Sequence, residues 1–367
     1  MPSNNTHIPL AKTDIGPAET AAVTRVVKSG RLALGPEIVE FEREFADWHR
    51  VSCAAMVNSG TSALICALRA VGVKPGDEVI LPALTFVGTV NAVLNCGALP
   101  VLVDVRHDTG NIDSDKVTNA IRKRTRAIIP VHLFGRVADM APIVDIANDH
   151  QLAVVEDAAE ALGSELNDRR VGTIGDAGIF GFYPNKVLTT GEGGMVISDD
   201  IQLTERVRSI ANQGRGCEDI GAGFSFRATE LAAALGRTQL QSLSERINER
   251  MELAAQYHNE LSAVAGIEPF GYSCGVRSWF TFPVLLSTAV NRAQLMRFLS
   301  VNGIDSADYF PALHTLNGFT GKLDSLDSLA VSEDLGRRLL CLPFWPGMQT
   351  HLPHIAKTLE RGIAQSR

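Results

Sequence analysis

One lysine in this chain lies in surroundings that favour an unprotonated amine. Lys186 follows the run Phe-Tyr-Pro-Asn at 182–185 and precedes the glycine-rich run Gly-Glu-Gly-Gly at 191–194. A lysine attacks a carbonyl only as the neutral amine, and apolar surroundings lower its pKa because they disfavour the charged form. These residues predict a lysine that forms a Schiff base. A surface lysine in a hairpin is the alternative interpretation.

Two further motifs offer groups for an anion and for a cationic ring. Ser59, Gly60 and Thr61 follow an apolar run and open a helix, so backbone N–H groups and a hydroxyl would meet an anion at the helix N-terminus. Asp157 ends another apolar run, where a carboxylate could pair with a pyridinium nitrogen. Taken singly, the first motif also fits a plain N-cap, and Asp157 also fits an exposed acid that begins a helix.

Phe86 supplies a possible fourth component. Its ring follows a predicted strand and could stack on a flat cofactor, although a core phenylalanine is the alternative. An anion cradle, an aromatic ring, a carboxylate and a lysine of lowered pKa are the parts that pyridoxal 5'-phosphate requires. Their coincidence at the ends of predicted strands indicates that cofactor.

The elements that must position these residues follow an α/β order. We expect strands at 53–57, 78–81, 100–103, 127–131, 152–156, 179–182 and 195–198, and helices between them at 61–71, 113–122 and 139–150. This alternation predicts a mostly parallel seven-stranded sheet flanked by helices. In such sheets, ligands bind beyond the carboxyl ends of the strands, where the four motifs fall.

The rest of the chain divides around this block. Helices are expected at 17–29 and 37–49, before the first strand, and a long charged helix at 243–261. Mixed strand and helix follow, at 282–286, 292–301 and 354–361. We therefore expect a large domain over residues 1–242 and a smaller α+β domain over residues 243–367.

Composition narrows the function classes. The chain has 367 residues and a formal net charge of −7, which argues against a nucleic-acid surface. No stretch approaches the roughly 18 to 20 apolar residues needed to cross a bilayer, so we expect a cytoplasmic protein without membrane contact. We expect neither a disulfide nor a metal site, because the cysteines are widely spaced and form no CxxC pair: Cys53, Cys66, Cys96, Cys217, Cys274 and Cys341.

Short motifs follow one another in order along nearly the whole chain. They are Ser29-Gly30, Leu34-Gly35-Pro36, Ser59-Gly60-Thr61, residues 75–80, Thr85-Phe86, Asn111-Ile112-Asp113, residues 130–133, residues 156–159, Lys186 with residues 191–194, residues 309–311, and His314. Their order and spacing resemble the DegT-type sugar aminotransferases, which are fold type I pyridoxal-phosphate enzymes.

The resemblance implies roles for residues of this chain. It implies a Schiff-base lysine at Lys186, a partner for the pyridine nitrogen at Asp157, a stacking ring at Phe86, and phosphate-binding amides at Gly60 and Thr61. It also implies that a loop matching residues 223–229 of a neighbouring subunit completes the phosphate site through Arg227. The enzyme would then be an obligatory homodimer with its active site at the subunit interface.

Two positions depart from the common pattern of these relatives. Glu160 stands where many have glutamine, and Gly181 stands where many have serine, so a hydroxyl that would bind phosphate is missing. The Glu160 carboxylate would repel a phenolate on the cofactor unless it is protonated or turned toward the sugar. A glutamate here is similar to the branch that makes perosamine and related 4-amino sugars. We expect substrate contacts from Glu160, Tyr183, Tyr309 and His314.

The leading prediction is a transaminase that moves an amino group from L-glutamate to a nucleotide-linked 4-keto-6-deoxy sugar, for polysaccharide or natural-product biosynthesis. Alternatives are amination at C3 or of a cyclitol ketone, and a dehydratase that uses the same cofactor, although related dehydratases carry histidine where this chain has Lys186. A regulator that binds the cofactor without turnover is a third. A fourth is an enzyme for amino acids only, in which Arg227 or Arg277 would clamp the substrate carboxylate.

Overall fold

The computed structural model describes residues 7–217, 221–271, 276–319, 321, 323–325 and 327–366. Within these residues the central element is an eight-stranded sheet, in which every neighbouring pair is parallel except the two pairs that include β9. The order is β1 (Cys53–Val57), β9 (Gly194–Ser198), β8 (Ala177–Gly181), β5 (Ala153–Asp157), β4 (Thr125–Ile128), β2 (Glu78–Pro82), β3 (Leu99–Val103) and β12 (Asp324–Ser325).

The seven expected strands are confirmed, with ends that differ by a few residues. The eighth strand, β12, comes from the C-terminal part of the chain and pairs in parallel with the edge strand β3. It is a two-residue polar segment, Asp324–Ser325, so it carries none of the apolar alternation by which strands are recognised in a sequence.

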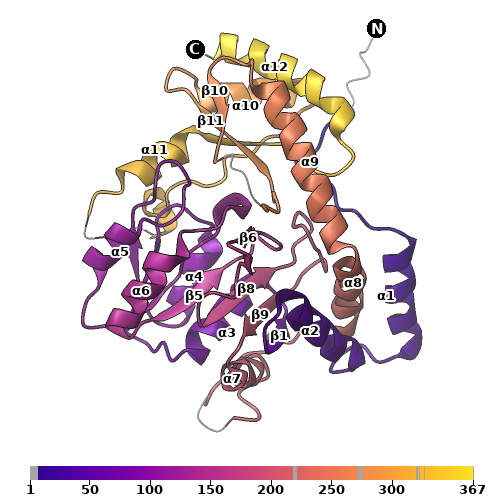
Figure 1. Ribbon diagram of the computed structural model, residues 1–367, viewed down its shortest axis with the longest axis vertical. Helices are drawn as coiled ribbons and strands as arrows, with labels where there is room; N and C mark the ends of the chain where they lie inside the picture. The colour runs from indigo at the N-terminus through magenta and orange to yellow at the C-terminus, as the bar shows by residue number, and fades with distance from the viewer. Residues whose placement is uncertain are drawn as a thin grey trace.

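Helices cover both faces of this sheet (Figure 1). Val79 and Leu81 of β2 contribute to one apolar core and Ile80 to another, because successive strand residues point to opposite faces. The helices that share the first core are α3 (Gly60–Ala70), α4 (Val87–Asn95) and α7 (Ile201–Ala211), and those that share the second are α5 (Ser114–Ala120) and α6 (Met140–His150).

The N-terminal helices form a layer beside the sheet, in which α2 packs against a third core and α1 packs on α8. Phe41 and Phe45 of α2 are fully buried against Phe180 and Phe182, which confirms the core packing of that helix. The helices of this layer are α1 (Pro17–Ser29), α2 (Pro36–His49) and α8 (Glu230–Gln241). Of the helices described so far, α4, α7 and α8 were not among those expected from the sequence.

The C-terminal part has its own antiparallel sheet and its own apolar core. Figure 1 shows α9 running from the side of α8 toward α12. The elements are α9 (Leu243–Leu261), β10 (Ile267–Pro269), β11 (Phe282–Leu286), α10 (Arg292–Val301), α11 (Ala330–Arg338), β13 (Leu339–Leu342) and α12 (Leu352–Gln365). Ile8, from the other end of the chain, also belongs to this core. A domain boundary at residues 242 and 243 stays a prediction.

Two further expectations concern helices and cysteines. In the part of the chain that the structure describes, no helix is both long and apolar enough to cross a membrane. Cys274 lies outside the described residues, and the other cysteines are free thiols: Cys53, Cys66, Cys96, Cys217 and Cys341.

Candidate active site

The carboxyl ends of the parallel strands border a cavity of about 390 Å³. β1 leads into α3, β2 leads through residues 83–86 into α4, and β5 and β8 end at Asp157 and Gly181. The parallel order brings these ends to one edge of the sheet. Eight residues singled out from the sequence line this one cavity: Gly60, Thr61, Phe86, Asp157, Glu160, Tyr183, Lys186 and Tyr309.

Lys186 lies in the turn that follows β8, and its side chain is only 17% exposed. Its Nζ lies 3.7 Å from Oε1 of Glu160 and 3.9 Å from the ring centre of Phe280. Burial lowers the pKa of Lys186, although the carboxylates of Glu160 and Asp157 act in the opposite direction. The amine is therefore easier to deprotonate than an exposed lysine, as a nucleophile requires.

Asp157 is buried and held by hydrogen bonds to both carboxylate oxygens. The Thr89 hydroxyl donates to Oδ2 at 2.8 Å, and the Ala159 N–H donates to Oδ1 at 3.3 Å. Thr89 has one hydroxyl proton, so in its 3.2 Å contact with Thr85 the Thr85 hydroxyl must be the donor. Burial raises the pKa of Asp157, and the Thr89 bond opposes that rise. The alternative of an exposed acid is wrong.

The N-terminus of α3 reaches the cavity because glycines let it approach the sheet. Ser59 caps the helix and accepts the Ser62 N–H at 3.1 Å, which leaves the first amides, at Gly60 and Thr61, without carbonyl partners inside the helix. A Cβ on Gly60 would lie 3.2 Å from the Cα of Gly181. A larger residue at position 60 would therefore push the helix terminus off β8.

Gly181 has room for a side chain that it lacks. A Cβ at this position would lie 3.6 Å from both the Cβ of Ala159 and the Cα of Gly60, which is ordinary van der Waals contact. A serine side chain would therefore fit at position 181 without a steric clash.

Glu160 is held at the wall of the cavity by the backbone. Its Oε2 accepts the Phe134 N–H at 3.0 Å, while Oε1 faces Lys186. Burial raises the pKa of Glu160, which favours the protonated acid beside any second negative charge.

Aromatic rings form the rest of the wall. Phe86 caps α4 at its N-terminus and is 54% exposed, so the alternative of a core phenylalanine is wrong. Its ring centre lies 5.9 Å from that of Phe310, which stacks on Tyr309. Tyr183 is equally open at 54% exposure. These rings leave flat, accessible surfaces on which a planar ligand can stack.

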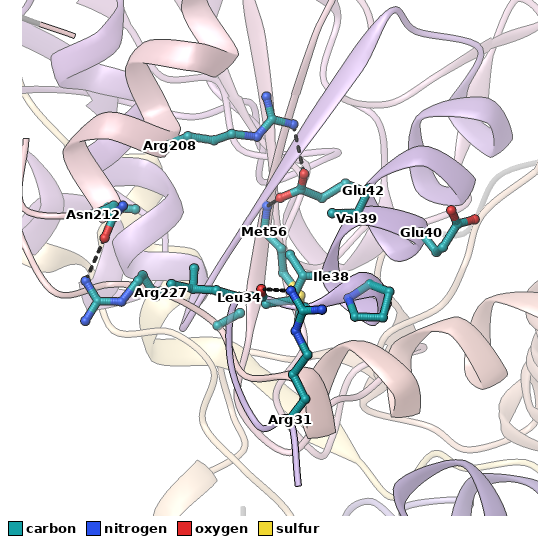
Figure 2. Close-up of a pocket in the computed structure, with 14 residues that line it drawn as sticks. Arg31, Leu34, Ile38, Val39, Glu40, Glu42, Met56, Arg208, Asn212 and Arg227 are labelled. Carbon is teal, nitrogen blue, oxygen red and sulfur yellow. Dashed lines mark hydrogen bonds and ion pairs between the residues drawn. The ribbon is translucent and has the colours of Figure 1, made fainter. Parts of the chain in front are cut away.

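Two predicted residues do not reach the cavity of their own chain. Arg227 lies in a separate groove of about 530 Å³, which Leu34 and Val39 also line (Figure 2). Its guanidinium donates to Oδ1 of Asn212 at 2.9 Å and to the hydroxyl of Ser225 at 3.0 Å.

His314 follows the cavity-lining residues Tyr309 and Phe310 in sequence but lies outside the lining itself. Its Nε2 is 3.0 Å from Oε1 of Glu333 on α11. The expected substrate contact therefore has no support from the position of this side chain.

The suggested role of Arg277 as a carboxylate clamp is wrong for this structure. Its side chain is buried at 4% exposure, lies outside the cavity lining, and donates to the backbone carbonyls of Phe134 and Gly271.

Three cavity residues were not given roles from the sequence. Thr89 lies three residues after Phe86, on α4, but the sequence alone does not show which residue the hydroxyl of a helical threonine binds. Asn185 directly precedes Lys186, and its Oδ1 has no hydrogen-bond partner among the described residues. Phe280 comes from the C-terminal part, and only the folded chain brings it to Lys186.

Comparison with known proteins places this site in a family. Residues 13–360 match the DegT/DnrJ/EryC1/StrS aminotransferase family. The chain is 37% identical over 324 residues to a GDP-perosamine synthase of Caulobacter vibrioides, covering 86% of this chain and 87% of that protein. It is 38% identical over 341 residues to a dTDP-3-amino-3,4,6-trideoxy-alpha-D-glucose transaminase of Streptomyces venezuelae, covering 90% and 88%.

A solved structure agrees over the whole fold. The S. venezuelae protein DesV, in complex with a ketimine intermediate, superposes with a TM-score of 0.89 at 35% identity and covers 97% of this chain and 98% of that one. The expected large parallel sheet with flanking helices is thus confirmed both by the strand order and by this likeness. This chain therefore belongs to the DegT/DnrJ/EryC1/StrS aminotransferase family.

Proposed function

We propose that this aminotransferase uses pyridoxal 5'-phosphate to move an amino group from L-glutamate to the keto carbon of a nucleotide-linked 4-keto-6-deoxy sugar. One observation carries the proposal: a largely buried lysine of lowered pKa and a hydrogen-bonded carboxylate share a cavity with the N-terminus of a helix.

The residues of the cavity fit this cofactor. The amides of Gly60 and Thr61 would hold its phosphate, the ring of Phe86 would cover one face of the pyridine, and Asp157 would pair with the ring nitrogen. When bound, pyridoxal phosphate supplies an electron sink for the negative charge that develops at the donor carbon. A cationic ring nitrogen would also offset the cost of burying the Asp157 carboxylate.

Lys186 has two roles in this proposal. Its neutral amine would hold the cofactor covalently between turnovers, and the free Nζ would take the proton from the donor Cα. The lowered pKa keeps more of the amine in the basic form at neutral pH. In the second half-reaction the same Nζ would deliver a proton to the former keto carbon of the sugar.

The sugar is inferred from the names of the relatives and from the polar groups of the cavity. A GDP-perosamine synthase and a dTDP-amino-sugar transaminase are among the similar proteins. We propose that Glu160, Tyr183 and Tyr309 contact the sugar, because they line the cavity that holds Lys186. Amination at C3 is the second candidate, since the name of the Streptomyces relative places the amino group at that carbon.

The test combines an adduct with a substrate panel. Purified protein should show a borohydride-reducible cofactor adduct on Lys186, located by mass spectrometry, and should aminate 4-keto sugars carried on GDP, UDP or dTDP at the expense of glutamate. Lys186→Ala should lose both properties, with Lys74→Ala as the control. An adduct and full transamination that survive in Lys186→Ala would overturn the proposal. Amination of 3-keto sugars alone would favour the second candidate.

We also propose a homodimer in which Arg227 serves the phosphate site of the other subunit. The support is that Arg227 lies outside its own cavity, beside the exposed side chains of Leu34 and Val39, which are 63% and 61% exposed. Figure 2 shows this groove with Arg31 and Arg227 at its edge. Exposed apolar side chains that gather in one groove are typical of an interaction surface.

Mixing inactive subunits tests the dimer. Lys186→Ala and Arg227→Ala should each be inactive or weak alone. A mixed dimer has one site with both native residues only if Arg227 acts across the interface, so mixing should restore up to about half the activity per mixed dimer. A monomer in analytical ultracentrifugation, or no restoration in mixed dimers formed by co-expressing the two variants, would contradict this arrangement.

A further inference from the structure

A segment of the C-terminal part, residues 276–281, runs beside the cavity and contributes Phe280 to its wall. The Val276 carbonyl accepts the Glu165 N–H at 3.0 Å, and the Ser278 N–H donates to the Ser164 hydroxyl at 3.0 Å. Residues 277–281 are all buried. The segment carries Phe280 to the Lys186 amine, at 3.9 Å.

Arg277 ties this segment to the turn at Leu133–Gly135. Its Nε and Nη2 both donate to the Phe134 carbonyl, at 3.2 and 3.0 Å. The N–H of the same residue, Phe134, donates to Glu160. Phe134 has a φ of 53°, a conformation that non-glycine residues adopt only when their surroundings enforce it. Phe134 thus links the two side chains: its carbonyl accepts from Arg277, and its N–H donates to Glu160.

A second arginine holds the same segment from α9. Arg250 Nη1 donates to the Trp279 carbonyl at 3.0 Å. Among the described residues, no carboxylate lies within ion-pair distance of Arg250 or Arg277, and burial lowers their pKa values to about 10 and about 9. A buried cation without an acid is costly. Arg250 instead donates to one backbone carbonyl and Arg277 to two, and each guanidinium also lies over an aromatic ring, which points to a positioning role.

We propose that Arg277 is a positioning residue that fixes two groups against the Lys186 amine, namely Glu160 through the Phe134 peptide and Phe280 through the 276–281 segment. The inference rests on the proposed function in taking Lys186 as the reacting amine. A carboxylate and an aromatic face both favour the ammonium form. Arg277 therefore tunes the basicity of Lys186 without touching it.

Other charged groups near Lys186 also influence its pKa and must stay the same in all variants that are compared. Asp157 acts on the amine from β5. A second, small space bordered by Lys186 is also lined by charged residues of the N-terminal segment and α9: Lys12, Asp14, Arg246 and Arg250. None of these would be altered by the variants below.

The test measures the pKa of the Lys186 amine in the cofactor-free full chain, from the pH dependence of its acetylation by acetic anhydride, followed by mass spectrometry. Phe280→Leu should lower that pKa by about 0.4 to 1.5 units, because the ring no longer stabilises the ammonium. Arg277→Lys, which keeps the charge but loses the forked contact, should lower it by about 0.4 units or more.

Coupling between the variants decides the inference. In a Phe280→Leu, Glu160→Gln background, Arg277→Lys should lose more than half of its effect, because the groups that it positions are gone. Arg292→Lys is the matched control, since Arg292 also donates to backbone carbonyls, at Gly336 and Leu339, away from the cavity. It should leave the pKa of Lys186 unchanged.

The outcomes separate this inference from the proposed function. An unchanged or raised pKa in Arg277→Lys, an equal effect in both backgrounds, or an equal shift in Arg292→Lys would overturn the positioning role. If Arg277→Lys does not fold, Ser164→Ala, which removes the contact with Ser278, should give a smaller shift of the same sign. The titration uses the cofactor-free protein. If no cofactor adduct forms on Lys186, the proposed function is refuted, but the measured pKa values still test the role of Arg277.

Discussion

Removing the Thr89 hydroxyl should weaken catalysis through Asp157. Thr89→Val keeps the shape of the side chain but deletes the donor that lies 2.8 Å from Oδ2 of Asp157. Both residues are buried, so water cannot easily replace the lost bond. A hydrogen bond to a charged group contributes about 1.5 to 3 kcal/mol. The value of kcat/KM for glutamate should therefore fall about 10- to 150-fold.

The same deletion should change the pH dependence. The Thr89 bond holds the pKa of Asp157 down against burial, so its loss should raise that pKa further. Because the anionic carboxylate is the active form, activity should be lost at a higher pH in Thr89→Val than in the native enzyme. Thr85→Val removes only the donor to Thr89, a neutral pair, and should cost about 2- to 12-fold.

Single-turnover kinetics with glutamate between pH 5 and 9 would measure both effects, and Thr89→Ser, which keeps the hydroxyl, is the control. Thermal unfolding would show whether each variant is folded. If Thr89→Val matches Thr89→Ser within about twofold over the whole pH range, the hydrogen bond does not support Asp157 and the reasoning fails.

Two other positions give independent predictions. Gly181→Ser should tighten cofactor binding about tenfold or more, because its hydroxyl can donate a hydrogen bond to the phosphate. Gly181→Ala fits the same space and should not tighten binding. Fluorescence titration would measure both cofactor affinities, and equal values would contradict this prediction. Burial lowers the pKa of His49 from 6.5 to about 3. As the pH falls between these values, the unfolded chain takes up a proton on His49 that the folded protein does not. The free energy of unfolding should therefore decrease, by up to about 1.4 kcal/mol per pH unit. His49→Phe should remove that one-proton slope from urea unfolding curves, and an unchanged slope would mean that His49 is not the group responsible.

Part of the site could be predicted because it depends on local order. The amides of Gly60 and Thr61, the carboxylate of Asp157 and the amine of Lys186 each follow a strand, and parallel strands bring their carboxyl ends to one edge. The helix Pro17–Ser29 has the bounds expected from the sequence, because the proline at its start and the glycine that follows it are local signals of helix ends.

Other features could not be predicted because they depend on residues far apart in the chain. Arg227, Arg250 and Arg277 look alike in the sequence, yet Arg227 lines an open groove while the other two hold backbone carbonyls in the interior. The strand β12 exists only because the C-terminal part returns to the edge of the large sheet.

The sequence by itself determined the α/β class, the order of the seven strands along the chain and the chemical parts of the site, since periodicity and the order of motifs are local properties of a chain. Only the tertiary structure decided that Thr89 bonds to Asp157, that Phe280 covers Lys186, and that His314 and Arg277 lie outside the cavity. The physical reason is that burial and hydrogen-bond partners are set by packing between distant segments, which no residue type specifies alone.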